Sequence, residues 1–231
     1  MSKVFHYADI EPSPTGTMLV HAADEDAGTG LNQAVLRCRP GRSAVRSPGA
    51  DRLETLYVLS GEGVLHRADG DHALRPESAA LIVGSDTYEI TATGEMVLVS
   101  VSANTDPEVE CDAPRPTVDL AGQSTQDAVS RREFQVLFDP DSGCSGVTQF
   151  LGCIPPVRTP LRYHPYSEMA FVVSGCGKVE IAGEMSVIGP GSCFSLPAGV
   201  HHRVENLQDG FLRLLGVFTP VGSPAQNFPV E

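Results

Sequence analysis

The sequence of 231 residues contains no tryptophan, only two lysines, and far fewer basic than acidic residues. The 16 Lys and Arg residues face 29 Asp and Glu residues, and the formal net charge is -13. A surface of this sign repels phosphate backbones and anionic lipids. The composition therefore argues against nucleic-acid binding and against attachment to a membrane surface.

Long apolar runs are also missing, and none approaches the roughly 18 residues that suggest a membrane span. The first 17 residues carry acidic residues and prolines but no apolar segment of a secretory signal, so a cytoplasmic protein is expected. The six cysteines form no CxxC pair, which excludes the usual zinc-ribbon spacing and gives no disulfide framework. Most of them are expected to be buried thiols.

The main feature that is present is an internal repeat. Residues 53–63 (LETLYVLSGEG) align with residues 167–177 (SEMAFVVSGCG) at an offset of 114 residues. The same offset continues without a gap and pairs Tyr88 with His202. Such self-similarity predicts two copies of one structural unit.

Each copy consists of apolar runs of four to eight residues bounded by Gly, Pro, Asp and Ser, which is typical of β-strands and turns. Helical periodicity is nearly absent, and we expect one short helix at most, in 126–134. The sequence predicts an all-β protein with a sandwich, barrel or jelly-roll architecture. The expected division is an N-terminal domain at 1–105, a linker at 106–130 and a C-terminal domain at 131–231.

The second copy carries two motifs that identify a family resemblance. Residues 191–206 (GSCFSLPAGVHHRVEN) are similar to the second cupin motif, G-x5-P-x-G-x2-H-x3-N, and 162–175 resemble the first, HxH-x3,4-E-x6-G. Arg162 stands where the first histidine of the latter is expected. The resemblance implies a bicupin, two tandem double-stranded β-helix (jelly-roll) domains. It also implies one metal site in the second copy, with His164, Glu168 and His202 as ligands.

The chemistry of these residue types can be considered separately from the family. Two neutral imidazoles and one carboxylate leave coordination positions open, which suits Fe(II) and dioxygen and can also hold Mn, Ni, Co or Zn. We expect one divalent ion, with Fe(II) favoured. The alternative is that both histidines are satisfied polar residues in a barrel without a metal.

Arg162 and Tyr166 are the candidate substrate-contacting residues. On a strand, side chains two apart share a face, so Arg162 is expected to point inward with His164. There it either binds a substrate carboxylate through its planar guanidinium or forms an ion pair with Glu168. Tyr166 is expected in the pocket as a hydroxyl donor or stacking wall. Tyr163 and His201 are expected to face outward.

The first copy lacks the ligand pattern. At the offset of 114, His164 falls on Ala50, Arg162 on Pro48 and His202 on Tyr88, which leaves only Glu54 opposite Glu168. One carboxylate does not retain a divalent ion, so we expect a cavity filled by apolar side chains and a structural role. His66 and His72 are expected at the surface.

Three functions follow from these observations. The first is a mononuclear metal enzyme, with an Fe(II) oxygenase favoured, that acts on a small organic acid or aromatic substrate. The second is redox-neutral metal catalysis of an isomerisation, cyclisation or hydrolysis, and the third is a small-ligand binding protein without turnover. The expected partner is a small, anionic molecule, and a homodimer is compatible with the sequence.

Overall fold

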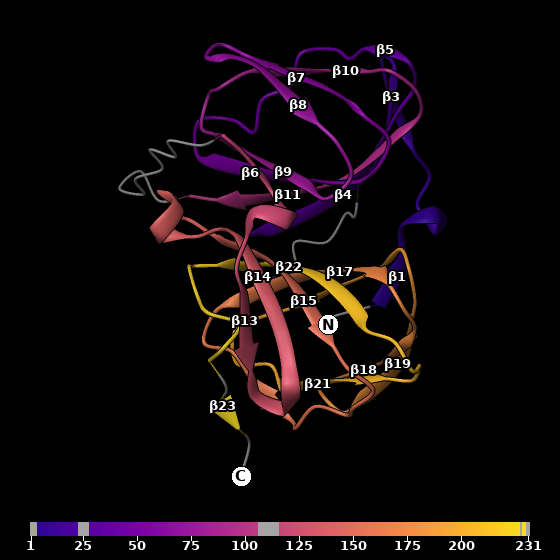
Figure 1. Cartoon of the computed structure of the whole chain (residues 1–231), viewed down its shortest axis with the longest axis vertical. Helices are drawn as coiled ribbons and strands as arrows, with labels where there is room; N and C mark the ends of the chain where they lie inside the picture. Colours follow the sequence, from indigo (N-terminus) through magenta and orange to yellow (C-terminus); the bar gives the residue numbers. More distant parts are fainter. Residues whose placement is uncertain (1–3, 23–27, 106–115, 227, 230–231) are drawn as a thin grey trace.

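Two barrels of similar construction make up the computed structural model, which describes residues 4–22, 28–105, 116–226 and 228–229. Each barrel is formed by a seven-stranded sheet packed on a smaller sheet, and the barrels lie one above the other (Figure 1). The expected all-β architecture with two tandem copies is therefore confirmed. No helix in the described ranges is long and apolar enough to cross a bilayer.

The first barrel combines a seven-stranded sheet of order β12-β9-β6-β11-β4-β3-β2 with a four-stranded sheet of order β5-β10-β7-β8. The large sheet contains β2 (Ser13–Thr15), β3 (Met18–Ala22), β4 (Leu31–Cys38), β6 (Arg52–Ser60), β9 (Ser78–Val83), β11 (Met96–Asn104) and β12 (Thr117–Asp119). The small sheet contains β5 (Gly41–Arg42), β7 (Gly63–Arg67), β8 (Gly70–Leu74) and β10 (Tyr88–Ala92). Apolar side chains such as Leu56, Leu65 and Ile90 fill the space between the two sheets.

The second barrel repeats this order as β1-β20-β17-β22-β15-β14-β13, packed on β19-β18-β21-β16-β23. Its large sheet contains β1 (Val4–His6), β13 (Thr125–Ala128), β14 (Arg132–Phe138), β15 (Thr148–Ile154), β17 (Ser167–Ser174), β20 (Ser192–Leu196) and β22 (Leu212–Thr219). Its small sheet contains β16 (Arg162–Tyr163), β18 (Gly177–Ile181), β19 (Glu184–Ile188), β21 (His202–Asn206) and β23 (Phe228–Pro229). The 3-10 helices are η1 (Tyr7–Asp9), η2 (Leu120–Gly122), η3 (Val129–Arg131) and η4 (Pro140–Ser142).

The Ser-Gly-x-Gly turn of the repeat is explained by its backbone. Gly61 has a φ of +82° and Gly175 a φ of +91°, a region that L-residues rarely adopt. A Cβ at Gly63 would lie 2.5 Å from the carbonyl oxygen of Thr91, and one at Gly177 would lie 2.3 Å from that of Glu205. Only glycine fits at these positions, and this preserves the motif in both copies.

The two barrels exchange edge strands. β1, at the start of the chain, pairs with β20 of the second barrel, whereas β12 follows the first copy in the chain and pairs with β9 of the first barrel. Each exchanged strand covers an edge that would otherwise expose unpaired backbone groups. The boundaries expected at 105/106 and 130/131 remain a prediction, and residues 106–115 lie outside the described residues.

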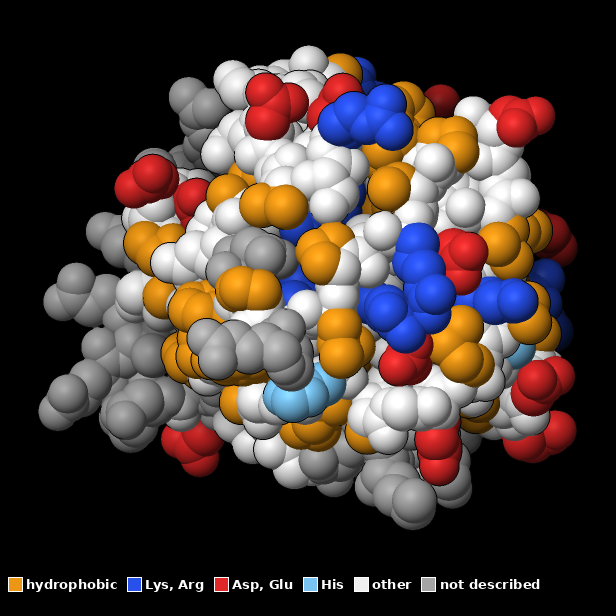
Figure 2. All heavy atoms as spheres, turned by 90° about the horizontal axis from the view of Figure 1, so that it is seen from below, with side chains coloured by type: hydrophobic (Ala, Val, Ile, Leu, Met, Phe, Trp, Pro, Cys, Tyr) orange, Lys and Arg blue, Asp and Glu red, His pale blue; other side chains and the backbone are white. Residues whose placement is uncertain are grey.

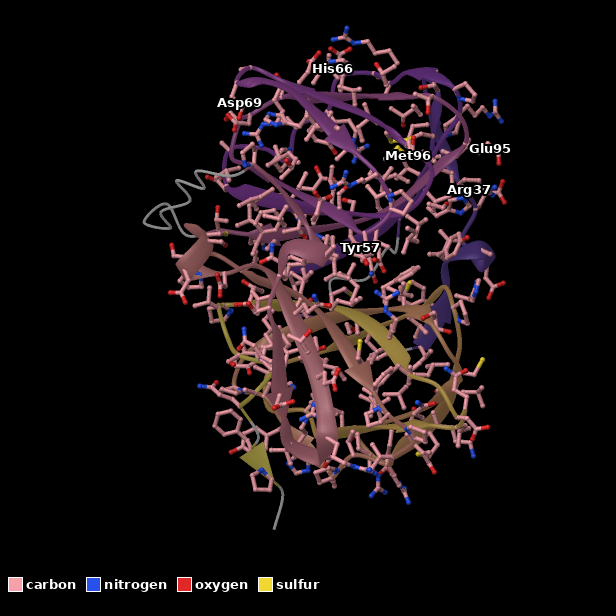
Figure 3. The ribbon with its side chains drawn as sticks, viewed as in Figure 1. Arg37, Tyr57, His66, Asp69, Glu95 and Met96 are labelled. Atoms are coloured by element: carbon pink, nitrogen blue, oxygen red, sulfur yellow. The ribbon has the colours of Figure 1, made fainter. Side chains whose placement is uncertain are left out.

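The two large sheets pack against each other through a shared apolar core. Tyr57 on β6 lies between the barrels (Figure 3), in one cluster with Leu151, Phe171 and Leu215 of the second copy. At the edge of this interface Arg213 forms an ion pair with Glu77. This buried apolar contact joins the first copy to the second.

The expected helix in 126–134 is wrong. β13 and β14 form an antiparallel hairpin there, with Gln126 opposite Phe134. The turn between them places Ser130 and Arg131 at positive φ, so the chain reverses direction within three residues. β14 then pairs along β15, and this ladder decides the local structure.

Candidate metal centre

Four elements of the second barrel bring the candidate residues together. Arg162 on β16 lies directly across from His202 on β21, and Glu168 lies on β17. His164 sits in the bend between β16 and β17, where its carbonyl oxygen accepts a hydrogen bond of 2.7 Å from the Gly199 N–H. The turn of the second motif therefore holds the backbone of the first.

His164, Glu168 and His202 form the one group of three or more metal-ligating side chains within the described ranges. Each offers a ligand atom, and these atoms lie within 4.8 Å of one another. The Nε2 of His164 is 3.6 Å from the Oε2 of Glu168. The sequence-based ligand set is thus brought together, and all three side chains are buried.

Burial decides the charge of these groups. Loss of solvent, followed by the effect of His202, lowers the pKa of His164 to about 2. Loss of solvent and the nearby Arg162 lower the pKa of His202 to about 3. Burial raises the pKa of Glu168 to about 7, although Arg162 and Arg132 favour its charged form. Both imidazoles are therefore neutral near pH 7, which is the state that binds metals.

The donor atoms fit a divalent cation. The Nδ1–H of His202 donates to the carbonyl oxygen of Val200 at 2.9 Å, so its Nε2 carries the free lone pair. That Nε2 is buried without a hydrogen-bond partner. On His164 the Nε2 lies beside Glu168, and the buried Nδ1 has no partner. Metal–donor distances of about 2.0–2.3 Å place ligand atoms roughly 3–4 Å apart. The 3.6 Å between the Nε2 of His164 and the Oε2 of Glu168 already lies in this range.

A cavity of about 40 Å³, enough for a few water molecules, lies beside these residues. Arg162, His164 and Glu168 line it together with apolar side chains that include Phe134, Phe150, Ile154, Leu214 and Phe218. Arg162 is 6% exposed, and its Nε and Nη1 have no hydrogen-bond partner. Within the part of the chain that the structure describes, Arg162 forms no ion pair with Glu168, although its charge favours the ionised form of that acid. A direct ion pair between the two residues is therefore not formed.

Arg132 on β14 also lines this cavity and was missed by the sequence reasoning. Its Nε donates to the carbonyl oxygen of Val129 at 2.9 Å, whereas its buried Nη2 has no partner. Loss of solvent and the neighbouring Arg162 lower its pKa to about 10. The residue lies outside both motifs, within the segment expected to be helical, and no sequence signal marked it as inward-facing.

Tyr166 does not occupy the place that was expected. Its hydroxyl donates to the carbonyl oxygen of Ser223 at 2.9 Å, and its ring stacks on His164 with an interplanar angle of 9°. The ring also packs on Phe218. The hydroxyl is therefore used by the C-terminal segment, and the ring supports His164 from behind. A catalytic role for Tyr166 stays a prediction.

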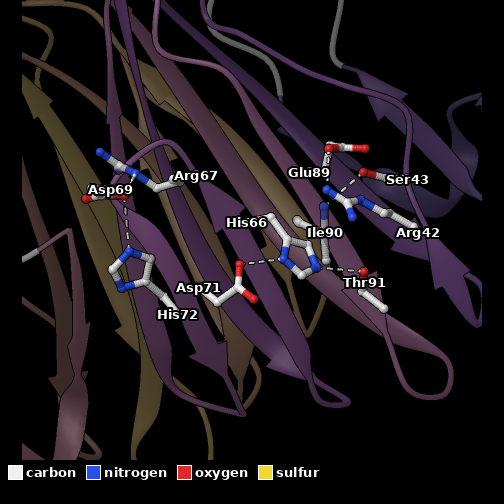
Figure 4. A network of polar contacts seen from close by, with 10 residues as sticks. All are labelled: Arg42, Ser43, His66, Arg67, Asp69, Asp71, His72, Glu89, Ile90 and Thr91. Carbon is white, nitrogen blue, oxygen red and sulfur yellow. Dashed lines mark hydrogen bonds and ion pairs between the residues drawn. The ribbon is translucent and has the colours of Figure 1, made fainter.

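Tyr163 and the histidines that were expected to face outward or to lie at the surface are outside the cavity. Tyr163 contacts the rings of His201 and Phe228, and His201 is exposed. In the first barrel, His66 bridges Asp71 and Thr91, and His72 contacts Asp69 (Figure 4). These networks belong to partly exposed strands of the small sheet, as expected of surface residues.

At the end of the molecule formed by the second barrel, basic side chains lie among hydrophobic ones, with acidic groups beside several of them (Figure 2). On the small sheet, Arg158 and Arg203 both form ion pairs with Glu180. Arg132 and Arg162 differ from these surface arginines because neither forms an ion pair among the described residues. The buried arginines thus keep unused donors.

The first copy holds a closed polar network at the matching place. Arg46 lies across from Tyr88 as Arg162 lies across from His202. Glu54 accepts hydrogen bonds from the Tyr88 hydroxyl at 2.9 Å and the Ser100 hydroxyl at 2.5 Å, and Arg46 lies 3.5 Å from its Oε1. The ungapped offset had placed Arg162 on Pro48, which was wrong by two residues.

The expectation of an apolar filling is also wrong at this place. The first copy keeps a pocket of about 350 Å³, and its polar lining residues include Arg46, Arg52, Glu54, Ser100 and Ser102. Apolar side chains fill only the adjoining interior. The first copy has lost the two histidines, but it has kept the acid and an arginine.

Comparison with known proteins supports this assignment of the fold. The cupin domain family matches residues 151–218. A variant of Bacillus subtilis oxalate decarboxylase superposes with a TM-score of 0.76 at 13% identity, covering 94% of this chain and 76% of that one. AerE from Microcystis aeruginosa gives 0.75 at 14% identity, covering 90% and 96%. No curated protein matches the chain in sequence. At these identities the likeness concerns the fold alone.

Proposed function

Because the chain is a cupin-superfamily protein with one cluster of metal-ligating side chains, we propose that it is a mononuclear metal-dependent enzyme acting on a small organic acid. One observation carries the proposal. The acid of the first copy is fully paired, whereas the His164 and His202 nitrogens and the Arg162 guanidinium of the second copy have unused donor or acceptor atoms. Buried polar groups without partners are rare unless they meet a ligand.

The roles of the residues follow from their contacts. The bond from His202 to Val200 fixes its tautomer, and the stacking of Tyr166 fixes the ring of His164. Glu168 supplies the negative charge of the ligand set. A bound divalent ion would supply Lewis acidity and, in the case of Fe(II), activation of dioxygen. Arg162 would hold the carboxylate of the substrate, since a guanidinium matches a carboxylate with two parallel hydrogen bonds.

Two metals compete in this proposal. A ligand set of two histidines and one carboxylate with open positions favours Fe(II) and an oxygenase reaction on the organic acid or an aromatic substrate. One of the similar structures is Bacillus subtilis oxalate decarboxylase with its Mn(II) centres. This supports Mn(II) and redox-neutral chemistry as the second candidate. Ni, Co and Zn remain compatible with the donors. A cupin that binds a small ligand without catalysis is the third candidate.

Metal analysis of protein purified after growth with each of the five metals tests the proposal. We expect one ion per chain. Oxygen uptake with candidate organic acids supports the oxygenase, whereas turnover under nitrogen supports the redox-neutral alternative. Two ions per chain, or none with any supplied metal, would contradict the proposal, and bound metal without turnover of any acid would support the binding protein.

A second experiment concerns Arg162. Replacing it by methionine should leave the metal content unchanged and weaken the binding of acetate at least tenfold, because a charge-assisted hydrogen-bond pair is lost. Arg162→His restores the HxH pair and should tighten metal binding while acetate affinity falls. Loss of the ion in Arg162→Met would instead mean that the arginine keeps Glu168 in place. A cytoplasmic location and a homodimer also stay proposals.

A further inference from the structure

Two buried arginines line the cavity of the second copy, although one arginine is enough to neutralise a single carboxylate. Arg132 is 9% exposed and Arg162 is 6% exposed. Together they keep three buried nitrogen atoms without a partner, the Nη2 of Arg132 and the Nε and Nη1 of Arg162. Buried donors that lack a hydrogen-bond partner lower stability, so a ligand that accepts from them is expected to compensate.

The first copy shows that packing does not require an arginine at this position. The two large sheets can be matched residue by residue, starting from β6 and β17 and moving outward through the paired strands. In this match Val20 corresponds to Phe134, and Met18 therefore corresponds to Arg132. Met18 is 1% exposed and belongs to the apolar core of its barrel. A methionine fills this place where no ligand set exists, and a charged residue replaces it beside the histidines.

The charges of the lining residues and a divalent ion would be balanced by a ligand with two negative charges. Its lining residues carry two positive charges from Arg132 and Arg162 and two negative charges from Glu168 and Glu133, the latter partly exposed. The two buried imidazoles are neutral. A divalent ion adds two positive charges, and two carboxylates on one ligand would cancel them.

We propose that this cavity selects a small dicarboxylate, with one carboxylate held at the ligand cluster by Arg162 and the other held by Arg132. The inference rests on the proposed function for the placement of the first carboxylate. Arg132 and Arg162 come from different strands, and phenylalanine side chains lie in the wall of the same cavity. A ligand with carbon atoms between two acids matches this partly apolar wall better than a phosphate does. The small volume of the cavity, about 40 Å³, excludes diacids with a long carbon chain.

Calorimetric binding of malonate, propionate and inorganic phosphate to the metal-loaded protein tests the proposal. We expect malonate to bind at least tenfold more tightly than propionate, which has the same number of carbons but one carboxylate. Arg132→Met, which introduces the residue of the first copy, should abolish this preference while propionate affinity and metal content stay unchanged. Arg158→Met, which removes a charge from the outer surface, is the matched control and should leave all three affinities unchanged.

Equal affinity for malonate and propionate in the wild-type protein would overturn the proposal, as would a preference that survives in Arg132→Met. Phosphate binding more tightly than malonate would also overturn it. Should Arg132→Met fail to fold, Arg132→Lys carries the test, because lysine keeps the charge but gives up the planar pair of donors. A loss of at least threefold in malonate affinity alone supports the proposal, and no loss contradicts it.

The same titrations on metal-free protein separate this inference from the proposed function. If the protein retains no ion but still prefers malonate in a manner that depends on Arg132, the metal enzyme is wrong and the two-arginine site stands. If one ion binds and organic acids are turned over without any preference for two carboxylates, the metal enzyme stands and the two-arginine site is wrong.

Discussion

The two barrels place the same kinds of residue at matching positions and use them in opposite ways. In the first, Glu54 is surrounded by donors from Arg46, Tyr88 and Ser100. In the second, Glu168 accepts no hydrogen bond from the described residues and faces two imidazoles with free nitrogens. The carboxylate of Glu54 thus has all its partners within the protein. The unpaired polar atoms around Glu168 lower the stability of the fold, and a bound ligand that pairs with them would offset this loss.

The change from one site to the other depends on few positions. Strand register makes Ser100 the counterpart of Gly216, since each lies opposite a matching residue, Leu56 on β6 or Ala170 on β17. Ser100 donates to Glu54, but Gly216 has no side chain and leaves room for Phe150. A duplicated barrel can therefore become a structural support by filling the shell around one acid.

The largest expected effect separates the barrels by their metal. His202→Ala should remove the ion entirely, because the two remaining donors do not compete with water. Tyr88→Ala should leave the ion bound and lower the free energy of unfolding by about 3 kcal/mol, since it opens a cavity and removes a hydrogen bond to Glu54. Elemental analysis after dialysis and urea denaturation measure the two effects. An empty Tyr88→Ala protein and a loaded His202→Ala protein would reverse the assignment.

The acids themselves should respond unequally in metal-free protein. Glu54→Gln breaks a buried ion pair and should lower the free energy of unfolding by about 3 kcal/mol. Glu168→Gln should change it by less than about 1 kcal/mol at pH 7, because burial already raises the pKa of Glu168 to about 7 and the neutral form is well populated. Equal losses by urea denaturation would show that Glu168 is satisfied without a ligand.

Exchanging the matching residues Ser100 and Gly216 is expected to have a smaller effect on stability. A Cβ at Gly216 would lie 2.3 Å from the Cζ of Phe150, so Gly216→Ser should lower the free energy of unfolding by about 2 kcal/mol through overpacking. Ser100→Gly should cost about 1 kcal/mol by removing a donor from Glu54. Thermal denaturation measures the loss of stability in both variants. A Gly216→Ser protein as stable as the wild type would mean that Phe150 moves aside without cost.

Much of this difference could be predicted from the sequence, because the repeat and the motifs are local patterns. The short strands and the clustering of His164, Glu168 and His202 follow from turn glycines and fixed spacings. That these three residues bind a metal stays a prediction. The exchange of β1 and β12 could not be predicted, since it depends on pairing between residues far apart in the chain. The counterpart of Arg162 was misplaced because the loops before β6 and β17 differ in length.

Arg132 and Tyr166 illustrate the other limit of the sequence. The direction of a side chain depends on which neighbour its strand pairs with, and the hairpin of β13 and β14 decides this for Arg132. Tyr166 was expected in the pocket, but its ring stacks on His164, and the carbonyl oxygen that accepts its hydrogen bond lies more than fifty residues later, at Ser223. Neither contact leaves a pattern in the local sequence.

The smallest expected effect concerns Tyr166, whose counterpart at the offset of 114 is Arg52. Arg52 donates to Ser102, and Tyr166 packs on Phe218, so both residues contact matching positions by different chemistry. Tyr166→Phe keeps the ring on His164 and removes only the bond to Ser223, which should cost about 1 kcal/mol or less. Metal content and acetate affinity should stay unchanged, while amide exchange at 222–226 becomes faster. Weaker acetate binding with unchanged exchange would instead place the hydroxyl on the substrate.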